Sequence, residues 1–234
     1  MASLVSSSKF LSSIKYLIYL YVFIGFNLAL SSSYDDFFKA IEFDEPVAVQ
    51  QLLLRGFDPN TPTADLQTPL ILAIQKGSFR VSQVLLSSPQ LQVNRPNPSD
   101  ETPLMLAALK QQEALVKGLI RRGADINRPG WTPLHYAATT GHVGIIRLLL
   151  EHHAYIDTES PNGTTPLMMA AFYGTPEATK LLLEEGADPL LKNQQGLTAL
   201  DFATNGPHKE SVALIAAFSQ AAQARALEVK PAAK

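Results

Sequence analysis

The chain has 234 residues, with 19 lysines and arginines against 21 acidic residues, and it contains no cysteine. This near-balanced charge argues against a nucleic-acid-binding protein, which needs a basic patch to meet the phosphate backbone. Without cysteine the chain cannot form an iron–sulfur cluster, a thiol nucleophile or a lipid-modified N-terminal cysteine. The length suits either one large core or one solenoid.

The first 33 residues have the composition of a secretory signal peptide. Lys9 and Lys15 are the only charged residues before Asp35, and the largely apolar run 16–30 is followed by small residues up to Ser33. A basic start, an apolar core of about 7–15 residues and a small-residue exit describe such a leader. An uncleaved membrane anchor stays as the alternative, although a spanning helix needs about 20 apolar residues.

These features predict an exported protein whose mature chain has no membrane span. We expect it in the periplasm, with full secretion and anchoring through the leader left open as alternatives.

Residues 34–63 predict a capping unit at the start of a helical array. The segment 35–60 contains two apolar helical stretches and a closing Gly56, but it lacks the Thr-Pro-Leu opening found later in the chain. Pro46 marks the expected start of the second helix, because proline suits the first helical position. Terminal units of a stacked array are atypical, since one face meets water instead of a neighbour.

From residue 64 onward one unit recurs at a nearly fixed spacing. The tripeptide Thr-Pro-Leu or Thr-Ala-Leu opens it five times, in steps of 34, 30, 33 and 33 residues, at Thr68, Thr102, Thr132, Thr165 and Thr198. Threonine can cap a helix N-terminus, and the alanine pairs that follow allow a second helix to approach closely. A glycine then ends the short helix, and a leucine-rich run follows at helical spacing. A period near 33 residues indicates stacked helix pairs.

The segment 132–154, TPLHYAATTGHVGIIRLLLEHHA, resembles an ankyrin repeat, and the resemblance extends over roughly residues 34–225. It implies an all-α ankyrin-repeat solenoid of about six helix-turn-helix units with short β-hairpin connections, preceded by the signal peptide. The expected divisions are a signal peptide (1–33), an N-terminal capping repeat (34–63), four repeats (64–97, 98–127, 128–160 and 161–193), a C-terminal capping repeat (194–226) and a flexible tail (227–234).

Departures from the family pattern predict a slightly irregular stack. The repeat 64–97 carries an extra residue within 89–94 and has Leu66 where the family usually has a glycine. The connection from Asn127 to Trp131 is short, so its projecting hairpin should be truncated.

The sequence contains no familiar catalytic or metal-binding pattern. It has no GxSxG elbow, no HExxH motif and no phosphate-cradling glycine loop. His135 and His142 occupy positions where the ankyrin pattern uses histidine for structural hydrogen bonds. His152 and His153 are adjacent, so on a helix their side chains point about 100° apart and chelate a metal poorly. We therefore expect no enzyme activity, no metal and no cofactor.

The resemblance implies a concave binding surface formed by the residue before each threonine and by positions on the first helix of each repeat. Several of these positions carry large apolar or aromatic side chains, where a solvated face would be polar. The candidate partner-binding residues are Leu106, Lys110, Trp131, Tyr136, Met169, Phe172, Tyr173 and Phe202. Trp131 is the expected anchor. Packing between the helices is the alternative for these side chains, and for Leu106 both interpretations stay open.

Together these features predict a monomeric, non-catalytic scaffold that binds an unidentified protein partner and no nucleic acid. The alternative is a small enzyme or ligand carrier that uses a pocket near the fourth and fifth repeats (128–160 and 161–193). That alternative requires a deep pocket and a functional His135.

Overall fold

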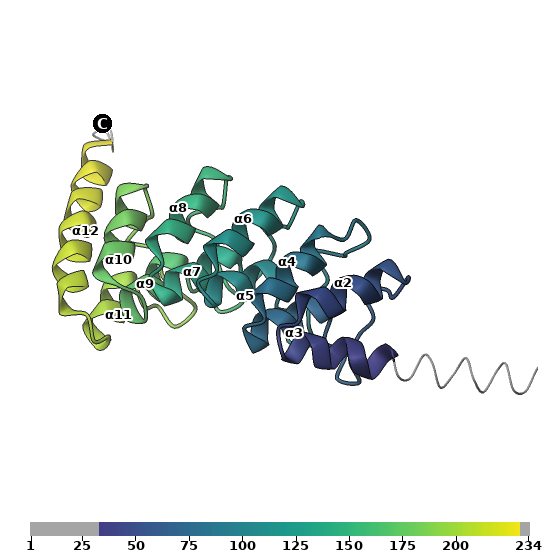
Figure 1. The fold of residues 1–234 in the computed structure, drawn as a ribbon. Helices are drawn as coiled ribbons and strands as arrows, with labels where there is room; N and C mark the ends of the chain where they lie inside the picture. Colours follow the sequence, from purple (N-terminus) through teal and green to yellow (C-terminus); the bar gives the residue numbers. More distant parts are fainter. Residues whose placement is uncertain (1–32, 230–234) are drawn as a thin grey trace, which may run out of the picture.

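The computed structural model describes residues 33–229, and their side chains up to residue 225. The predicted signal peptide, apart from its last residue, lies outside the described residues, as does the end of the predicted tail. The described chain forms helix pairs that stack side by side into an elongated array (Figure 1). This arrangement confirms the predicted all-α solenoid.

The helices form two layers, which Figure 1 shows along opposite edges of the array. One layer holds the first helix of each unit: residues 33–42, α3 (Pro69–Lys76), α5 (Pro103–Leu109), α7 (Pro133–Thr140), α9 (Pro166–Phe172) and α11 (Ala199–Asn205). The other layer holds the second helices: α2 (Pro46–Leu54), α4 (Phe79–Ser87), α6 (Glu113–Arg121), α8 (Val143–Glu151), α10 (Pro176–Glu184) and α12 (Lys209–Val229). The last helix runs three residues into the segment predicted as a tail.

Threonine caps start the first helices, as the repeat pattern predicts. In four units the threonine hydroxyl accepts the backbone N–H three residues on, at 3.3–3.4 Å: Thr68, Thr102, Thr165 and Thr198. Thr132 differs, because its hydroxyl lies 2.9 Å from Nδ1 of His135. The imidazole therefore takes part in the start of α7.

The connections between units are turns, so the predicted β-hairpins are wrong: no residue within 33–229 is in a β-strand. Two backbone hydrogen bonds close each of four turn tips, as from Thr63 N–H to the Gln67 carbonyl and from Leu66 N–H to the Thr63 carbonyl, both at 2.9 Å. In two of these tips an asparagine side-chain oxygen, of Asn97 or Asn193, accepts two further backbone N–H groups. In the described chain the shortened segment 127–131 has no such tip bond, in agreement with the expected truncation.

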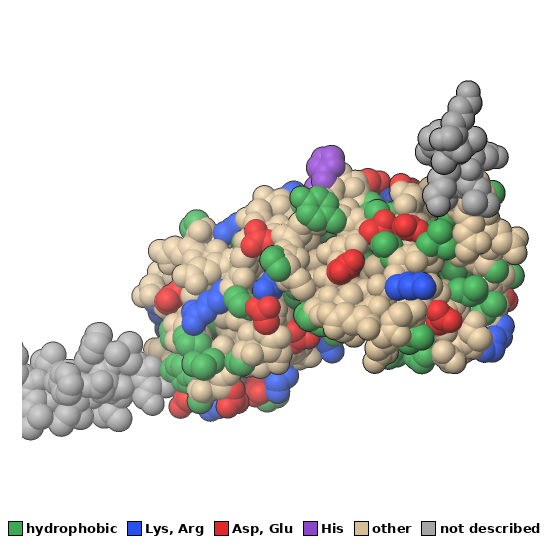
Figure 2. Space-filling view, turned by 180° about the vertical axis from the view of Figure 1, so that it is seen from behind, with side chains coloured by type: hydrophobic (Ala, Val, Ile, Leu, Met, Phe, Trp, Pro, Cys, Tyr) green, Lys and Arg blue, Asp and Glu red, His purple; other side chains and the backbone are tan. Residues whose placement is uncertain are grey.

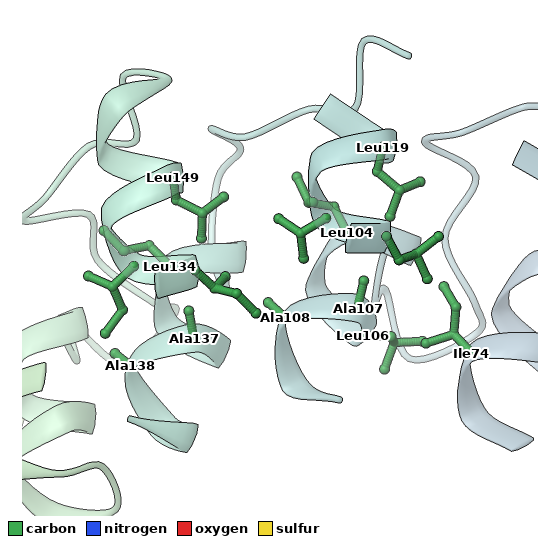
Figure 3. Close-up of a cluster of buried hydrophobic side chains, with 14 of the residues drawn as sticks. Ile74, Leu104, Leu106, Ala107, Ala108, Leu119, Leu134, Ala137, Ala138 and Leu149 are labelled. Atoms are coloured by element: carbon green, nitrogen blue, oxygen red, sulfur yellow. The ribbon is translucent and has the colours of Figure 1, made fainter. Parts of the chain in front are cut away.

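One continuous hydrophobic core joins the units, from Phe37 to Ile215. Figure 3 shows the repeating element of this core, in which small alanines on a first helix lie below a leucine of the second helix. Ala107 on α5 lies in this way near Leu119 on α6, and both are fully buried. The small methyl groups allow the two layers to approach closely, which explains the alanine pairs of the sequence.

A second, polar set of contacts joins successive turns. One asparagine in each of three units bridges to the next unit: Asn60, Asn94 and Asn127. Each amide donates to a backbone carbonyl at 2.7–3.2 Å, and its oxygen accepts a backbone N–H at 2.8 Å. The fourth equivalent position is Asp157, which accepts from Asp188 N–H at 3.1 Å but has no amide to donate. Burial raises the pKa of the Asp157 carboxyl, and its bond from Asp188 opposes this shift.

Within the described part of the chain, no helix combines the length and the apolar character that crossing a membrane requires.

Candidate functional site

A pocket of about 220 Å³ opens in the layer of first helices, where α5, α7 and α9 meet. Its lining consists of Leu109, Trp131, His135, Tyr136, Thr139 and Met169. Three of the predicted binding residues, Trp131, Tyr136 and Met169, are therefore brought together at one place. We call this hollow the Trp131 pocket.

Trp131 is placed by the shortened connection before it and by the cap of α7 directly after it. Its ring is partly exposed and meets the ring of His135 edge to face, with centroids 5.1 Å apart and planes at 74°. The truncation of the preceding loop thus leaves one side of a tryptophan accessible at the mouth of the pocket.

His135 forms the buried wall of the pocket, with 0% of its surface exposed. Its Nδ1 accepts the Thr132 N–H at 3.2 Å, so Nε2 carries the proton and donates to the Thr164 carbonyl at 2.9 Å. Burial lowers the pKa of His135 to about 4, and the bond to Thr164 opposes that shift only partly. The imidazole is therefore neutral at pH 7 and joins two repeats, which matches the structural role expected for this histidine.

Tyr136 connects the pocket to a fixed carboxylate. Its hydroxyl donates to Oε1 of Glu101 at 3.1 Å, while the amide of Asn97 donates to Oε2 at 2.8 Å. Burial, followed by the neighbouring Glu101 charge, raises the pKa of Tyr136 to about 12. Two donors thus hold the Glu101 carboxylate in one orientation beside the pocket.

Two other charged residues near this rim, Arg128 and Asp100, pair with each other. Arg128 contacts both carboxylate oxygens of Asp100, at 2.8 and 2.7 Å, and also its backbone carbonyl at 2.9 Å. No described residue forms an ion pair with Glu101. Glu101 therefore leaves one uncompensated negative charge beside the aromatic pocket.

The predicted concave surface includes the position of Glu101, but Glu101 was not among the candidate partner-binding residues. It precedes Thr102 as Trp131 precedes Thr132, and equivalent positions of successive repeats lie side by side in a stack.

Three other predicted residues form a separate group on α9 and α11, which we call the Tyr173 cluster: Phe172, Tyr173 and Phe202. The ring of Phe172 lies 4.5 Å from that of Tyr173 and 6.4 Å from that of Phe202. The two phenylalanines are partly buried, whereas Tyr173 is 58% exposed. Tyr173 is therefore the member of this group that can offer an aromatic surface to a partner.

The remaining two predicted residues differ in exposure: one is buried and the other is exposed. Leu106 is 3% exposed and lies toward Ile74 of the preceding unit (Figure 3), so the packing alternative holds for it and its assignment to the binding surface is wrong. Lys110 is exposed directly after α5, at the opposite end of that helix from Glu101.

The described residues contain no group of three or more histidine, aspartate or glutamate side chains placed to hold a metal ion. Figure 2 shows acidic and basic side chains interspersed over one face of the array, without a continuous basic surface on that face.

Comparison with known proteins agrees with the repeat architecture along the chain. The family model for ankyrin repeats in three copies matches residues 37–129, 92–160, 115–193 and 153–225. The crystal structure of the human ASB11 ankyrin repeat domain superposes with a TM-score of 0.70 at 27% sequence identity, covering 78% of this chain and 82% of that one.

Curated relatives match over shorter parts of much longer proteins. Mouse ankyrin repeat and SAM domain-containing protein 6 is 44% identical over 94 residues, which is 39% of this chain and 11% of the relative. Human transient receptor potential cation channel subfamily A member 1 is 30% identical over 187 residues, which is 76% of this chain and 17% of the channel. These matches, with the family model that spans nearly all of the described residues, show that the chain belongs to the ankyrin repeat family.

Proposed function

We propose that the chain is a non-catalytic scaffold that binds a protein partner through the Trp131 pocket and the neighbouring Tyr173 cluster. Ankyrin repeat domains generally mediate protein–protein interactions. The observation that carries the proposal is the convergence of Trp131, Tyr136 and Met169 from two successive repeats on one partly open pocket.

The side-chain types at this surface suit a binding role better than a catalytic one. Residues that dominate protein interfaces are enriched in tryptophan, tyrosine and arginine, and they sit in pockets from which water is excluded on binding. Both nitrogens of His135 are engaged in hydrogen bonds that hold the fold, so this histidine is not a free base for a reaction. The pocket therefore offers apolar contact area, and the Glu101 carboxylate that its Tyr136 contacts adds one fixed charge beside it.

Affinity capture from extracts of the native cell tests the proposal. The bait is the chain without residues 1–33, compared with its Trp131→Ala and Tyr173→Ala variants. We expect a partner that the unaltered bait retains and that Trp131→Ala loses by tenfold or more, because truncating a central aromatic costs about 2 kcal/mol or more.

Tyr155→Ala is the matched control, because Tyr155 is 68% exposed and outside both surfaces. Equal urea-unfolding midpoints must first show that all variants are folded. If Trp131→Ala and Tyr155→Ala retain the same proteins as the unaltered bait, the assigned surface is wrong.

We also propose that residues 1–33 export the chain. The support is the pair of lysines followed by the apolar run 16–30 and small residues. A fusion of residues 1–60 to alkaline phosphatase, which is active only outside the bacterial cytoplasm, should be active, and deletion of residues 16–30 should abolish that activity. Equal activity with and without the apolar run would contradict export by this segment.

A further inference from the structure

We propose that the Trp131 pocket receives an arginine side chain of the partner, whose guanidinium pairs with the Glu101 carboxylate. This inference rests on the proposed function and specifies the chemistry that the binding surface recognises.

The pocket has the size and the walls for one long side chain. At about 220 Å³ it is smaller than the cavities of roughly 300–1,000 Å³ that hold drug-sized ligands. Leu109 and Met169 provide apolar contacts for the methylene stem of an arginine. Trp131 and Tyr136 add aromatic rings, on which a guanidinium stacks more favourably than an ammonium.

The charge beside these rings is negative and fixed in place. Glu101 accepts one hydrogen bond on each oxygen, from Tyr136 and from Asn97. An ionised carboxylate has about four acceptor sites, so each oxygen can still accept one N–H from a guanidinium fork. Because Asp100 is already occupied by Arg128, Glu101 is the acid of this rim that remains to be neutralised.

The position of Lys110 bears on how the bound arginine is oriented. The seven-residue helix α5 alone puts roughly 10 Å between it and Glu101, more than the Debye length of about 8 Å in physiological salt. Lys110 therefore does not neutralise Glu101. The arginine head points toward the beginning of α5, where Glu101 lies.

An apolar anchor such as leucine fits the observations less well. A leucine would contact Leu109 and Met169. It would also cover the rim of the pocket and leave the Glu101 carboxylate without a positive partner. Burying an ionised carboxylate without such a partner is costly. Arginine satisfies both the apolar walls and the charge.

The single tryptophan of the chain makes this inference directly measurable, because tryptophan fluorescence, excited at wavelengths that tyrosine does not absorb, reports on Trp131 alone. The probes are three capped peptides with the sequence Gly-X-Gly, in which X is arginine, leucine or citrulline, the neutral isostere of arginine. We expect saturable fluorescence changes with the arginine peptide and an affinity at least about tenfold weaker for the other two. Binding of the arginine peptide should weaken as salt is added.

Glu101→Gln should reduce the affinity for the arginine peptide to that for citrulline, since it removes the charge and keeps the shape. Glu151→Gln removes a carboxylate from the end of α8 in the other layer and should change nothing. Urea-unfolding midpoints confirm that both variants are folded.

Three results would overturn the inference: equal binding of arginine and citrulline, tighter binding of leucine, or no saturable binding of any peptide. Each leaves the proposed scaffold function standing if partner capture still depends on Trp131. Capture that does not depend on Trp131 would instead contradict the proposed function itself.

Discussion

His135 shows how one side chain makes the stability of the stack depend on pH. Its pKa in the fold is about 4, below the ordinary 6.5, because the charged form would be buried. Folding therefore excludes a proton that the unfolded chain binds, so stability is full above about pH 6.5 and falls as the pH approaches 4. The loss over this window is about 3 kcal/mol.

His135→Met tests this account, since Met105 and Met168 occupy the same repeat position in neighbouring units. At pH 7 the variant should be about 1 kcal/mol less stable, because it loses the hydrogen bond to Thr164. Between pH 6.5 and 4 it should lose less stability than the unaltered chain. Parallel urea-unfolding curves over this pH range would contradict the proposed titration.

The backbone conformation of Leu66 also predicts a measurable effect on stability. It has φ 59° and is 63% exposed, where three later repeats have Gly130, Gly163 and Gly196. A left-handed conformation costs a non-glycine residue about 1–2 kcal/mol, part of which glycine returns through the greater freedom of the unfolded chain. Leu66→Gly should therefore raise the free energy of unfolding by about 0.5–1 kcal/mol.

The reverse substitution, Gly196→Leu, is the matched control for Leu66. A Cβ at Gly196 would meet no atom within 4 Å, so only its backbone conformation, φ 77°, opposes the change. Urea unfolding should show destabilisation by about 1–2 kcal/mol. If both substitutions destabilise the chain, conformational strain at this position is not the controlling factor.

At the scale of the element, the turns between units carry the prediction. Asp157→Asn would complete the set of bridging asparagines, with an amide able to donate to the carbonyl of Gly186, the equivalent of the Gly123 carbonyl that Asn94 reaches. We expect a gain of about 1 kcal/mol at neutral pH. Because the pKa of Asp157 is raised, its neutral form is favoured in the fold, and the gain should shrink as the pH falls through that pKa.

Asn127→Asp imposes the opposite change one unit earlier and should destabilise the chain by a similar amount at neutral pH. Chemical denaturation of both variants at neutral and acidic pH measures the difference. A stabilising effect of Asn127→Asp would contradict the role assigned to the donated hydrogen bond.

Elements and sites differed in how far the sequence predicted them. The helix pairs were predictable because Thr-Pro-Leu and the alanine pairs act within one unit. The convergence of Trp131, Tyr136 and Met169 agrees with the concave surface that the family resemblance implies, in which equivalent positions of adjacent repeats line up. Leu106 shares its repeat position with Tyr136, so the pattern could not separate an open position from one that packs toward Ile74.

The role of Glu101 could not be predicted from the sequence for a related reason. Its orientation depends on the hydroxyl of Tyr136, 35 residues later in the chain. The period shows that the two residues belong to neighbouring units, but only the structure shows that their polar atoms meet. The β-hairpins were overpredicted because two backbone bonds within each turn tip are sufficient to close it, and no strand ladder extends from any tip in the described residues.

For the whole molecule, stability depends on both ends of the array being closed. A chain that ends at residue 193 lacks α11 and α12 and leaves the buried faces of α9 and α10 open to water. Terminal units with a polar outer face are needed for solubility. We expect this truncation to aggregate in size-exclusion chromatography, while removal of residues 230–234 alone should leave a single unaltered peak. A well-behaved monomer ending at residue 193 would show that α10 can close the array.

The asparagine bridges between successive turns also bear on how such a chain can change its length through evolution. Each of the three bridges joins a unit to the one that follows and uses one side chain and two backbone groups, so the same chemistry recurs at three successive junctions. Duplication or loss of one whole unit would therefore rebuild an intact junction, whereas a change by a few residues would misplace the bridge. Inheritance by whole modules follows, and Asp157 is the junction residue of this set that donates no amide hydrogen bond.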